Sequence, residues 1–324
     1  MTIALVFGAT GQDGSILTDL LLERGYEVVG TYRKSATGNL NNLKHASLNP
    51  NFKLVKADLL DAGSVYRVIA NCQPDLIFNE ADQDHVGWSF EIPSYSMNVT
   101  VNGFITIAEA IRDCCTSARF FQPVSSNIFG RHETGKITSS TATSPVSPYG
   151  VAKAAVHELA NYYRTAHCLN IYTGILFNHE SPRRTIEYVS RKITSTVAAI
   201  KNGCRDTLVL GTLEARIDWG SAEDYMKLAI RMLESDAVPK SYVIGHGTAF
   251  SIRTLCEIAF EYVDLDLSKY IVLSDVYKRI TTTSVLEGDI SETISEFGDY
   301  RETSFKTLIE SMVDFDLNHK DEFV

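Results

Sequence analysis

The 324-residue sequence has few of the features that mark membrane-spanning, secreted or nucleic-acid-binding proteins. It contains no run of about 18 apolar residues, which a membrane-spanning helix would need. The first apolar run, Ile3–Phe7, is too short for a signal peptide and follows no basic segment. Acidic residues outnumber basic ones and give a formal net charge of −10, whereas binders of nucleic acid or anionic membranes present a basic surface. We therefore expect a cytoplasmic protein that binds neither nucleic acid nor membrane.

Cysteine is also sparse and shows no metal-binding pattern. None of the six cysteines forms a CxxC pair, so we expect neither a metal site nor a disulfide framework. These residues are Cys72, Cys114, Cys115, Cys168, Cys204 and Cys256. Hydrophobic residues make up 44% of the chain, which suits a globular protein with a large buried core.

In the first half of the chain, apolar runs of strand length alternate with amphipathic helical stretches. The expected strands are Ile3–Phe7, Glu27–Thr31, Phe52–Lys56, Leu76–Phe78, Arg119–Val124 and Ile171–Leu176. The expected helices are Gln12–Arg24, Ala62–Asn71, Asn98–Asp113 and Tyr149–His167. Such alternation predicts βαβ units and a parallel sheet covered by helices on both faces. The fold class is therefore α/β, with a doubly wound parallel sheet of the Rossmann type.

After about residue 178 the pattern changes, because helical segments mix with short strands. The expected helices are Arg184–Asn202, Ala222–Glu234, Ile252–Val263 and Ser304–Val313, and the expected strands are Thr207–Leu210 and Tyr242–Ile244. We interpret residues 178–324 as a smaller α/β substrate domain, partly interleaved with a dinucleotide-binding domain at 1–177. The Ser/Thr-rich stretch Gly135–Pro148 is expected to be a surface loop, and its position before Tyr149 would also suit an active-site lid.

A glycine pattern, GxxGxxG, lies between the first strand and the first helix. Glycines at these positions permit a tight turn and let backbone N–H groups approach a diphosphate at the helix N-terminus. The residues expected to bind the dinucleotide here are Gly8, Thr10, Gly11, Gln12, Asp13 and Gly14.

The ends of the second and third strands bear on which dinucleotide binds. An acid after the second strand would bind the ribose hydroxyl of NAD, whereas an arginine accommodates the 2′-phosphate of NADP. This chain has Arg33 and no acid at that place, which favours NADP(H). Asp58 and Leu59, after the third strand, suit a contact with adenine.

Tyr149 and Lys153 form a YxxxK pair at the start of an expected helix, where a spacing of four places both side chains on one face. A free tyrosine has a pKa of about 10, and a nearby lysine cation lowers it. The phenolate can then take the proton of a substrate hydroxyl while hydride leaves the same carbon for a nicotinamide. With Ser125 after the fifth strand, these residues predict a dehydrogenase site.

Several segments together resemble the GDP-mannose 4,6-dehydratase family of extended short-chain dehydrogenases. The matching pieces are GATGQDGS at 8–15, NEADQDHV at 79–86, SPYGVAK at 147–153, GILFNHESPRR at 174–184, DWGSAEDY at 218–225 and, more weakly, RITTTSVLEGD at 279–289. The resemblance covers nearly the whole chain and implies a GDP-sugar substrate and a homodimer or homotetramer.

The resemblance also implies roles for individual residues. Tyr149 would be the base, Lys153 its partner, and Ser125 the hydroxyl that polarises the sugar O4. Asn178 would bind the diphosphate. The further expected substrate-binding residues are Asp84, His179, Glu180, Arg184, Lys192, Arg216 and Arg279.

The chain departs from the family pattern at several of these places. Asn127 stands where the family's dehydratases carry a glutamate that removes the C5 proton, and an amide cannot accept that proton. Asp84 replaces a serine beside the sugar and would suit extra hydroxyls, as on a heptose. Thr282 stands where the family has a ribose-binding glutamate. Asn42 stands where a second arginine for the 2′-phosphate is usual, which moves the preference slightly to NAD(H) and leaves NADP(H) open.

The intact Ser125, Tyr149 and Lys153 with Asn127 lead to the prediction of a GDP-sugar 4-dehydrogenase that oxidises C4 of a GDP-mannose or GDP-heptose without dehydration. Such an enzyme would serve capsule or lipopolysaccharide sugar synthesis and would need a second oxidised co-substrate to turn over NADH. The alternatives are a GDP-mannose 4,6-dehydratase whose base is another acid (Glu133, Asp82 or Asp84), a 4-epimerase or 4-ketoreductase, and a non-catalytic sugar-nucleotide binder.

Overall fold

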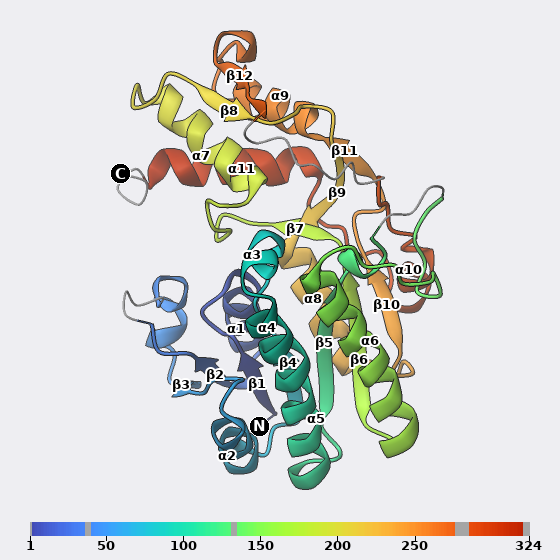
Figure 1. The fold of residues 1–324 in the computed structure, drawn as a ribbon. Coiled ribbons are helices and arrows are strands. Elements are labelled where there is room, and N and C mark those ends of the chain that lie inside the picture. Colours follow the sequence, from blue (N-terminus) through green and yellow to red (C-terminus); the bar gives the residue numbers. More distant parts are fainter. Residues whose placement is uncertain (1, 36–39, 131–134, 276–284, 320–324) are drawn as a thin grey trace.

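The computed structural model describes residues 2–35, 40–130, 135–275 and 285–319. Its centre is a seven-stranded sheet in the order β10-β6-β5-β4-β1-β2-β3, with every neighbouring pair parallel (Figure 1). The strands are β1 (Ile3–Phe7), β2 (Glu27–Tyr32), β3 (Phe52–Lys56), β4 (Leu76–Asn79), β5 (Arg119–Ser125), β6 (Asn170–Leu176) and β10 (Ser241–Ile244). The middle strands are apolar and buried, as a sheet covered on both faces requires. The predicted α/β, Rossmann-type fold is confirmed.

The direction in which strands are added reverses between β1 and β4. The chain runs from β1 to β2 and β3 on one side, and from β4 to β5 and β6 on the other. In open α/β sheets, ligands bind beyond the carboxyl ends of the strands at such a reversal. The residues that follow Phe7 and Asn79 therefore border the expected binding crevice.

Helices cover both faces of this sheet (Figure 1). On one face, α1 packs beside α8, and their apolar side chains share one core with the sheet. On the other face, α2, α5 and α6 enclose a second core. The bounds of these helices are α1 (Gln12–Glu23), α2 (Ala62–Cys72), α5 (Gly103–Cys114), α6 (Pro148–His167) and α8 (Ala222–Glu234).

Helix α6 begins at a well-defined residue. The Ser147 hydroxyl accepts a hydrogen bond from the backbone N–H of Gly150 at 3.0 Å, and Pro148 occupies the first helical position. Both features favour a helix start. The cap therefore sets where Tyr149 and Lys153 project from the first turns of α6.

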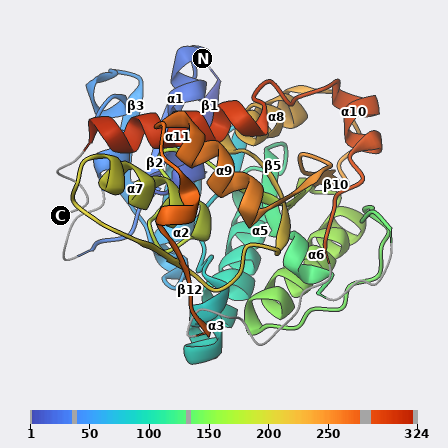
Figure 2. The same ribbon diagram turned by 90° about the horizontal axis from the view of Figure 1, so that it is seen from above.

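Most elements after residue 178 form a second layer beyond the end of the sheet opposite the N-terminus (Figures 1 and 2). Helices α7, α9 and α11 pack together around a third apolar core. β7 and β11 flank β9 in a small sheet, and β8 pairs with β12. The bounds are β7 (Asn178–Glu180), α7 (Val189–Lys201), β8 (Leu208–Leu210), β9 (Arg216–Ser221), β11 (Ala249–Ser251), α9 (Ile252–Tyr262), β12 (Ile271–Leu273) and α11 (Phe305–Asn318). α8 and β10 also follow residue 178 but belong to the main sheet layer, and a domain boundary at 177 stays a prediction.

Several elements differ from the expectations. The helix expected from Arg184 begins only at Val189, because residues 181–188 form turns. The helix expected from Asn98 starts with one π-helical stretch, Asn98–Asn102, before α5. Three short helices had no expected counterpart: α3 (Val86–Glu91), α4 (Pro93–Met97) and α10 (Ser291–Phe297).

The described residues contain neither a helix suited to cross a membrane nor a cluster suited to hold a metal ion. In that part of the chain no helix has both the length and the apolar character needed to cross a bilayer. The same residues contain no group of three or more His, Cys, Asp or Glu side chains placed to hold a metal ion.

Candidate active site

The glycine turn after β1 is shaped by close backbone contacts. Gly8 has a positive φ of 75°, and a Cβ there would lie 2.6 Å from the carbonyl carbon of Glu80. A Cβ on Gly14 would lie 2.2 Å from the Gly8 carbonyl oxygen, whereas one on Gly11 would have ordinary room. The turn leaves the N-terminus of α1 facing the crevice, where backbone N–H groups suit a diphosphate. A side chain on Gly8 or Gly14 would collide with neighbouring backbone and change the shape of this turn.

Further predicted cofactor residues lie along the same edge of the sheet. The Asn42 side chain donates a hydrogen bond to the Thr10 carbonyl at 3.1 Å and so supports the glycine turn. Arg33, after β2, donates to the Tyr95 hydroxyl at 2.7 Å. Asp58 follows β3 and accepts a hydrogen bond from a nearby backbone N–H, while Leu59 is buried in the core under α5.

The predicted catalytic residues come from two neighbouring elements, because Ser125 ends β5 while Tyr149 and Lys153 lie in the first turns of α6. The Lys153 ammonium lies 5.8 Å from the centre of the Tyr149 ring and donates to the Pro123 carbonyl at 3.2 Å. Burial raises the pKa of Tyr149, while the Lys153 cation and a hydrogen bond with Ser125 oppose that rise. The structure therefore brings the three residues into one site, in which Tyr149 and Lys153 are buried and Ser125 is half-buried.

Asn127 donates two hydrogen bonds to Ser125. The Ser125 Oγ accepts one hydrogen bond from the Asn127 backbone N–H at 3.2 Å and another from its side-chain Nδ2 at 2.9 Å. With two donors bound to its oxygen, the Ser125 hydroxyl is left to donate its own proton. Donation toward the sugar O4 is what the role expected of Ser125 requires.

Two acids that were not among the predicted site residues lie in the loop after β4. Asp82 forms an ion pair with Lys153, with 2.5 Å between Oδ2 and Nζ, and its other oxygen accepts from the Thr100 hydroxyl. Glu80 lies beside the glycine turn, and burial raises its pKa to about 8. An acid directly after a buried strand at the reversal of strand order is a signal that could have pointed to Glu80. Sequence reasoning considered Asp82 only as a possible alternative base.

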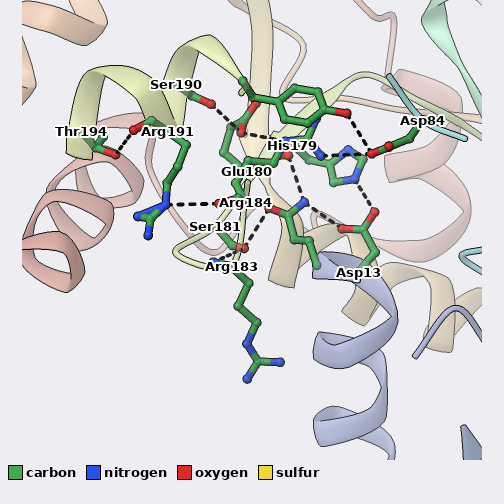
Figure 3. Close-up of polar contacts among 12 residues, drawn as sticks. Asp13, Asp84, His179, Glu180, Ser181, Arg183, Arg184, Ser190, Arg191 and Thr194 are labelled. Atoms are coloured by element: carbon green, nitrogen blue, oxygen red, sulfur yellow. Dashed lines mark hydrogen bonds and ion pairs between the residues drawn. The ribbon is translucent and has the colours of Figure 1, made fainter. Parts of the chain in front are cut away.

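Beyond the crevice, the N-terminus of α1 is tied to β7 by polar contacts (Figure 3). His179 Nε2 lies 2.8 Å from Asp13 Oδ2, and Gln12 donates to the His179 carbonyl at 3.3 Å. Ser181 Oγ donates to Gln12 Oε1 at 2.9 Å. Burial alone would raise the pKa of Asp13, but the neighbouring His179 keeps that pKa below the usual value. Burial alone would lower the pKa of His179, but Asp13 raises that pKa above the usual value. Asp13 and His179 therefore form a hydrogen-bonded pair.

A second set of contacts links β7 to the loop after β4 (Figure 3). Buried Glu180 accepts a hydrogen bond from Ser190 at 2.6 Å and lies 3.4 Å from the Arg184 guanidinium. Arg184 stacks on the Tyr188 ring at 3.4 Å from its centre. The Tyr188 hydroxyl donates to Asp84 Oδ2 at 2.9 Å. Asp84 therefore contacts the second layer through Tyr188, and its charge acts on Tyr149.

The other predicted substrate residues lie on separate elements of the second layer. Asn178 is exposed at the start of β7, and half-buried Lys192 lies on α7. Arg216, exposed at the start of β9, donates across the small sheet to the Ala249 carbonyl at 2.7 Å. Arg279 lies outside the described residues, as do Glu133 and Thr282.

The doubly wound parallel sheet, the glycine turn and the Ser-Tyr-Lys set define an extended short-chain dehydrogenase/reductase. The chain belongs to the GDP-mannose 4,6 dehydratase family, whose model matches residues 5–312. It is 38% identical over 325 residues to "GDP-mannose 4,6 dehydratase 1" of Arabidopsis thaliana, covering 97% of this chain and 90% of that protein. It is 34% identical over 349 residues to "GDP-mannose 4,6-dehydratase" of Vibrio cholerae, covering 97% and 93%.

Among solved structures, a dTDP-glucose 4,6-dehydratase of Streptomyces venezuelae with NAD bound resembles the fold with a TM-score of 0.87 at 23% identity, covering 99% of this chain and 98% of that one. NAD in that structure agrees with the nicotinamide cofactor predicted for this chain.

These comparisons overturn the leading functional prediction. Oxidation at C4 without dehydration was expected from Asn127, but relatives at 34–38% identity over nearly the full chain are named dehydratases. The inference was wrong because it let one residue decide the outcome, although other carboxylates border the same site. The alternative of 4,6-dehydration fits the family better.

Proposed function

We propose that this chain catalyses the 4,6-dehydration of GDP-mannose or a closely related GDP-hexose. The observation that carries the proposal is that half-buried Ser125 lies with the buried Tyr149 and Lys153, in a chain of this family that also has the glycine turn. The glycine turn suits a dinucleotide, because a side chain at Gly8 or Gly14 would collide with backbone and disrupt the tight turn that leaves the N-terminus of α1 open to a diphosphate. When bound, a nicotinamide would take hydride from the sugar C4 and return it at C6.

The first step uses the three residues at the end of β5 and the start of α6. Ser125 donates a hydrogen bond to the sugar O4, an orientation favoured by the two donors on its own oxygen. Tyr149, as phenolate, takes the O4 proton when hydride leaves C4. Lys153 stabilises that phenolate by its positive charge. The result is a ketone at C4.

The second step needs a base for C5, because the C4 ketone acidifies that proton and water then leaves from C6. The Asn127 amide cannot accept a proton, and Asp82 is held by Lys153 and Thr100. Asp84 is the remaining acid of this loop whose charge acts on Tyr149, and its Oδ2 is positioned by the Tyr188 hydroxyl. We assign the proton transfer at C5 to Asp84.

Mass spectrometry of the product tests the function. The purified chain is incubated with GDP-mannose, and in parallel with a GDP-manno-heptose, in the presence of NAD or NADP. A product lighter by one water is expected, and Tyr149→Phe should give none. A product lighter only by one H2, or unchanged GDP-mannose with every cofactor, would contradict dehydration.

The variant Asp84→Asn tests the assigned base separately. It should lose water elimination by about 10²–10⁴-fold, while transient reduction of the cofactor by the substrate persists. Unchanged elimination in this variant would remove Asp84 from the mechanism and leave the dehydratase proposal intact.

Two further features follow from the proposal. Because hydride returns to the same sugar, no second oxidised co-substrate is needed. We also propose that the layer after residue 178 binds the GDP moiety and that the protein is a homodimer or homotetramer, as the family resemblance suggests. Light scattering coupled to size-exclusion chromatography measures the oligomeric state directly, and a monomer at micromolar concentration would contradict that part.

A further inference from the structure

The catalytic lysine has a counter-ion inside the protein. Lys153 Nζ lies 2.5 Å from Asp82 Oδ2, and the two side chains are only 7% and 12% exposed. Lys153 also donates to the Pro123 carbonyl, and Thr100 donates to the second oxygen of Asp82. The carboxylate is therefore fixed on the lysine by contacts from α6 and from the helical segment that precedes α5.

This pairing changes the electrostatic balance at Tyr149. A lone lysine cation favours the phenolate, whereas an adjacent carboxylate disfavours it. Burial is the largest cause of the raised pKa of Tyr149, Lys153 opposes it, and Asp82 adds to it. Burial also opposes charge on Lys153, yet the Asp82 carboxylate keeps the lysine pKa above its ordinary value. The ion pair thus holds the lysine as a cation and at the same time weakens its effect on the tyrosine.

The groups that face the pair come from several elements. Tyr149 is affected by Lys153 from α6, by Asp82 and Asp84 from the loop after β4, and by the neutral Ser125 from β5. Lys153 is affected by Asp82, Tyr149 and Glu80. Tyr188, beyond Asp84, also interacts with Tyr149. Among the acids, only Asp82 makes an ion pair with Lys153 in the described part of the chain.

We propose that Asp82 is a tuning residue of the Tyr149–Lys153 pair: by neutralising much of the lysine charge, it keeps Tyr149 a neutral phenol in the resting site. The inference rests on the proposed function only in that Tyr149 is taken as the proton acceptor. Asp82 acts through Lys153 and therefore counts as a positioning residue. The consequence is that substrate oxidation requires a higher pH than in a site with an unpaired lysine.

Nuclear magnetic resonance tests this without substrate. The protein is labelled with ¹³Cζ-tyrosine and ¹³Cε-lysine and titrated as wild type, Asp82→Asn and Asp82→Ala, with Tyr149→Phe and Lys153→Arg to assign the two signals. In both Asp82 variants the first proton should leave the Tyr149–Lys153 pair about one pH unit or more below the wild-type value. Identical titrations in wild type and in the folded variants would overturn the proposal.

The variant Asp84→Asn is the matched control for the titration. Asp84 belongs to the same loop, but its side chain is 64% exposed and solvent screens its charge. Removing the Asp84 charge should lower the pH at which the first proton leaves the Tyr149–Lys153 pair much less than removing the Asp82 charge. An equal shift would mean that the general acidity of the loop, and not the ion pair, sets the titration, and this would also overturn the proposal.

Turnover gives an independent readout. The acid limb of the pH profile for GDP-mannose oxidation, followed as cofactor reduction, should move to lower pH in Asp82→Asn. If GDP-mannose is not converted by any variant but the titration shifts, the proposed function fails and the role of Asp82 stands. If GDP-mannose is dehydrated with the same pH profile and the same titration in wild type and in both Asp82 variants, the function stands and the role of Asp82 fails.

Discussion

Asn127 supports Ser125, the serine of the proposed catalytic set, through a contact that a carboxylate cannot make. Its Nδ2 donates to Ser125 Oγ at 2.9 Å. In Asn127→Asp the side chain keeps its shape but loses this donor. We expect the rate of C4 oxidation to fall about tenfold, the effect of losing roughly one hydrogen bond in the transition state. Stopped-flow measurement of cofactor reduction checks this.

Asn161→Asp is the control for that prediction, because Asn161 is an exposed residue of α6 and the charge change is the same. It should leave the rate unchanged. A rate in Asn127→Asp equal to that of the wild type would show that the orientation of the Ser125 hydroxyl does not depend on the amide.

The raised pKa of Glu80 should make the stability of the folded protein depend on pH. Burial raises its pKa in the folded protein to about 8, against an ordinary value of 4.5. Between these values the unfolded chain carries the charge and the folded protein does not, so this group lowers stability as pH rises from 4.5 to 8. Glu80→Gln should therefore be more stable than wild type at about pH 8.5, by roughly 1–3 kcal/mol. Urea unfolding measures the difference, which should vanish near pH 4.5; a pH-independent difference would contradict the buried acid.

The sequence predicted some of these residues and not others, for a physical reason. Gly8, Tyr149 and Lys153 belong to local spacings that have a meaning of their own, a turn and one helix face. Asp82 acquires its role only by meeting Lys153, which lies far along the chain on α6. No local pattern encodes that meeting, because the two residues come together only when β4 and β5 pair and α6 packs above them.

At the scale of single elements, the strand-turn-helix unit of β1 and α1 depends on its glycines unequally. A Cβ at Gly14 would lie 2.2 Å from the Gly8 carbonyl oxygen, whereas at Gly11 its nearest neighbour would be 3.5 Å away. Gly14→Ala must therefore displace backbone and should destabilise the cofactor-free protein by about 1–3 kcal/mol. Gly11→Ala, the matched control, should lower the stability of the cofactor-free protein much less. Thermal unfolding without cofactor separates this effect from lost binding, and equal melting temperatures would contradict it.

Elements that are stabilised by their own apolar pattern could be predicted from the sequence, whereas elements that depend on tertiary contacts could not. β1, β4 and β5 are buried apolar runs, and their boundaries were expected to within a residue or so. α3 and β7 have few residues and no clear periodicity, and α3 exposes Trp88 and Phe90. Their conformation depends on tertiary contacts and not on local propensity, so the sequence carried no signal for them.

At the scale of the whole molecule, polar contacts join the second layer to the sheet at the glycine turn. The pair of Asp13 and His179 links α1 to β7, and both side chains are largely buried. The segment FNHESPRR was expected to bind substrate, and here it also connects the two layers through Gln12 and Ser181. That double role could not be seen from sequence, because it depends on how the layers meet.

The Asp13–His179 contact should make the joining of the layers depend on pH. The pKa of His179 is raised above its ordinary 6.5 and that of Asp13 is lowered below 3.8. The stabilisation from His179 is complete below pH 6.5 and is lost as pH rises through its folded pKa, while that from Asp13 is present above pH 3.8 and is lost in stronger acid. The destabilisation caused by His179→Asn should therefore be largest near pH 5.5, about 1–3 kcal/mol, and should shrink at about pH 8.5.

Urea unfolding at these two pH values measures the effect. Lys240→Gln serves as the control, because Lys240 forms an ion pair with Glu292 in which both side chains are more than a third exposed, and such surface pairs contribute little. If His179→Asn is equally destabilising at both pH values, His179 stabilises the contact as a neutral ring, whose single N–H donates to either Asp13 or the Phe177 carbonyl but not to both. A difference confined to the acidic pH would instead show that the charge on His179 strengthens the connection between the two layers beside the glycine turn.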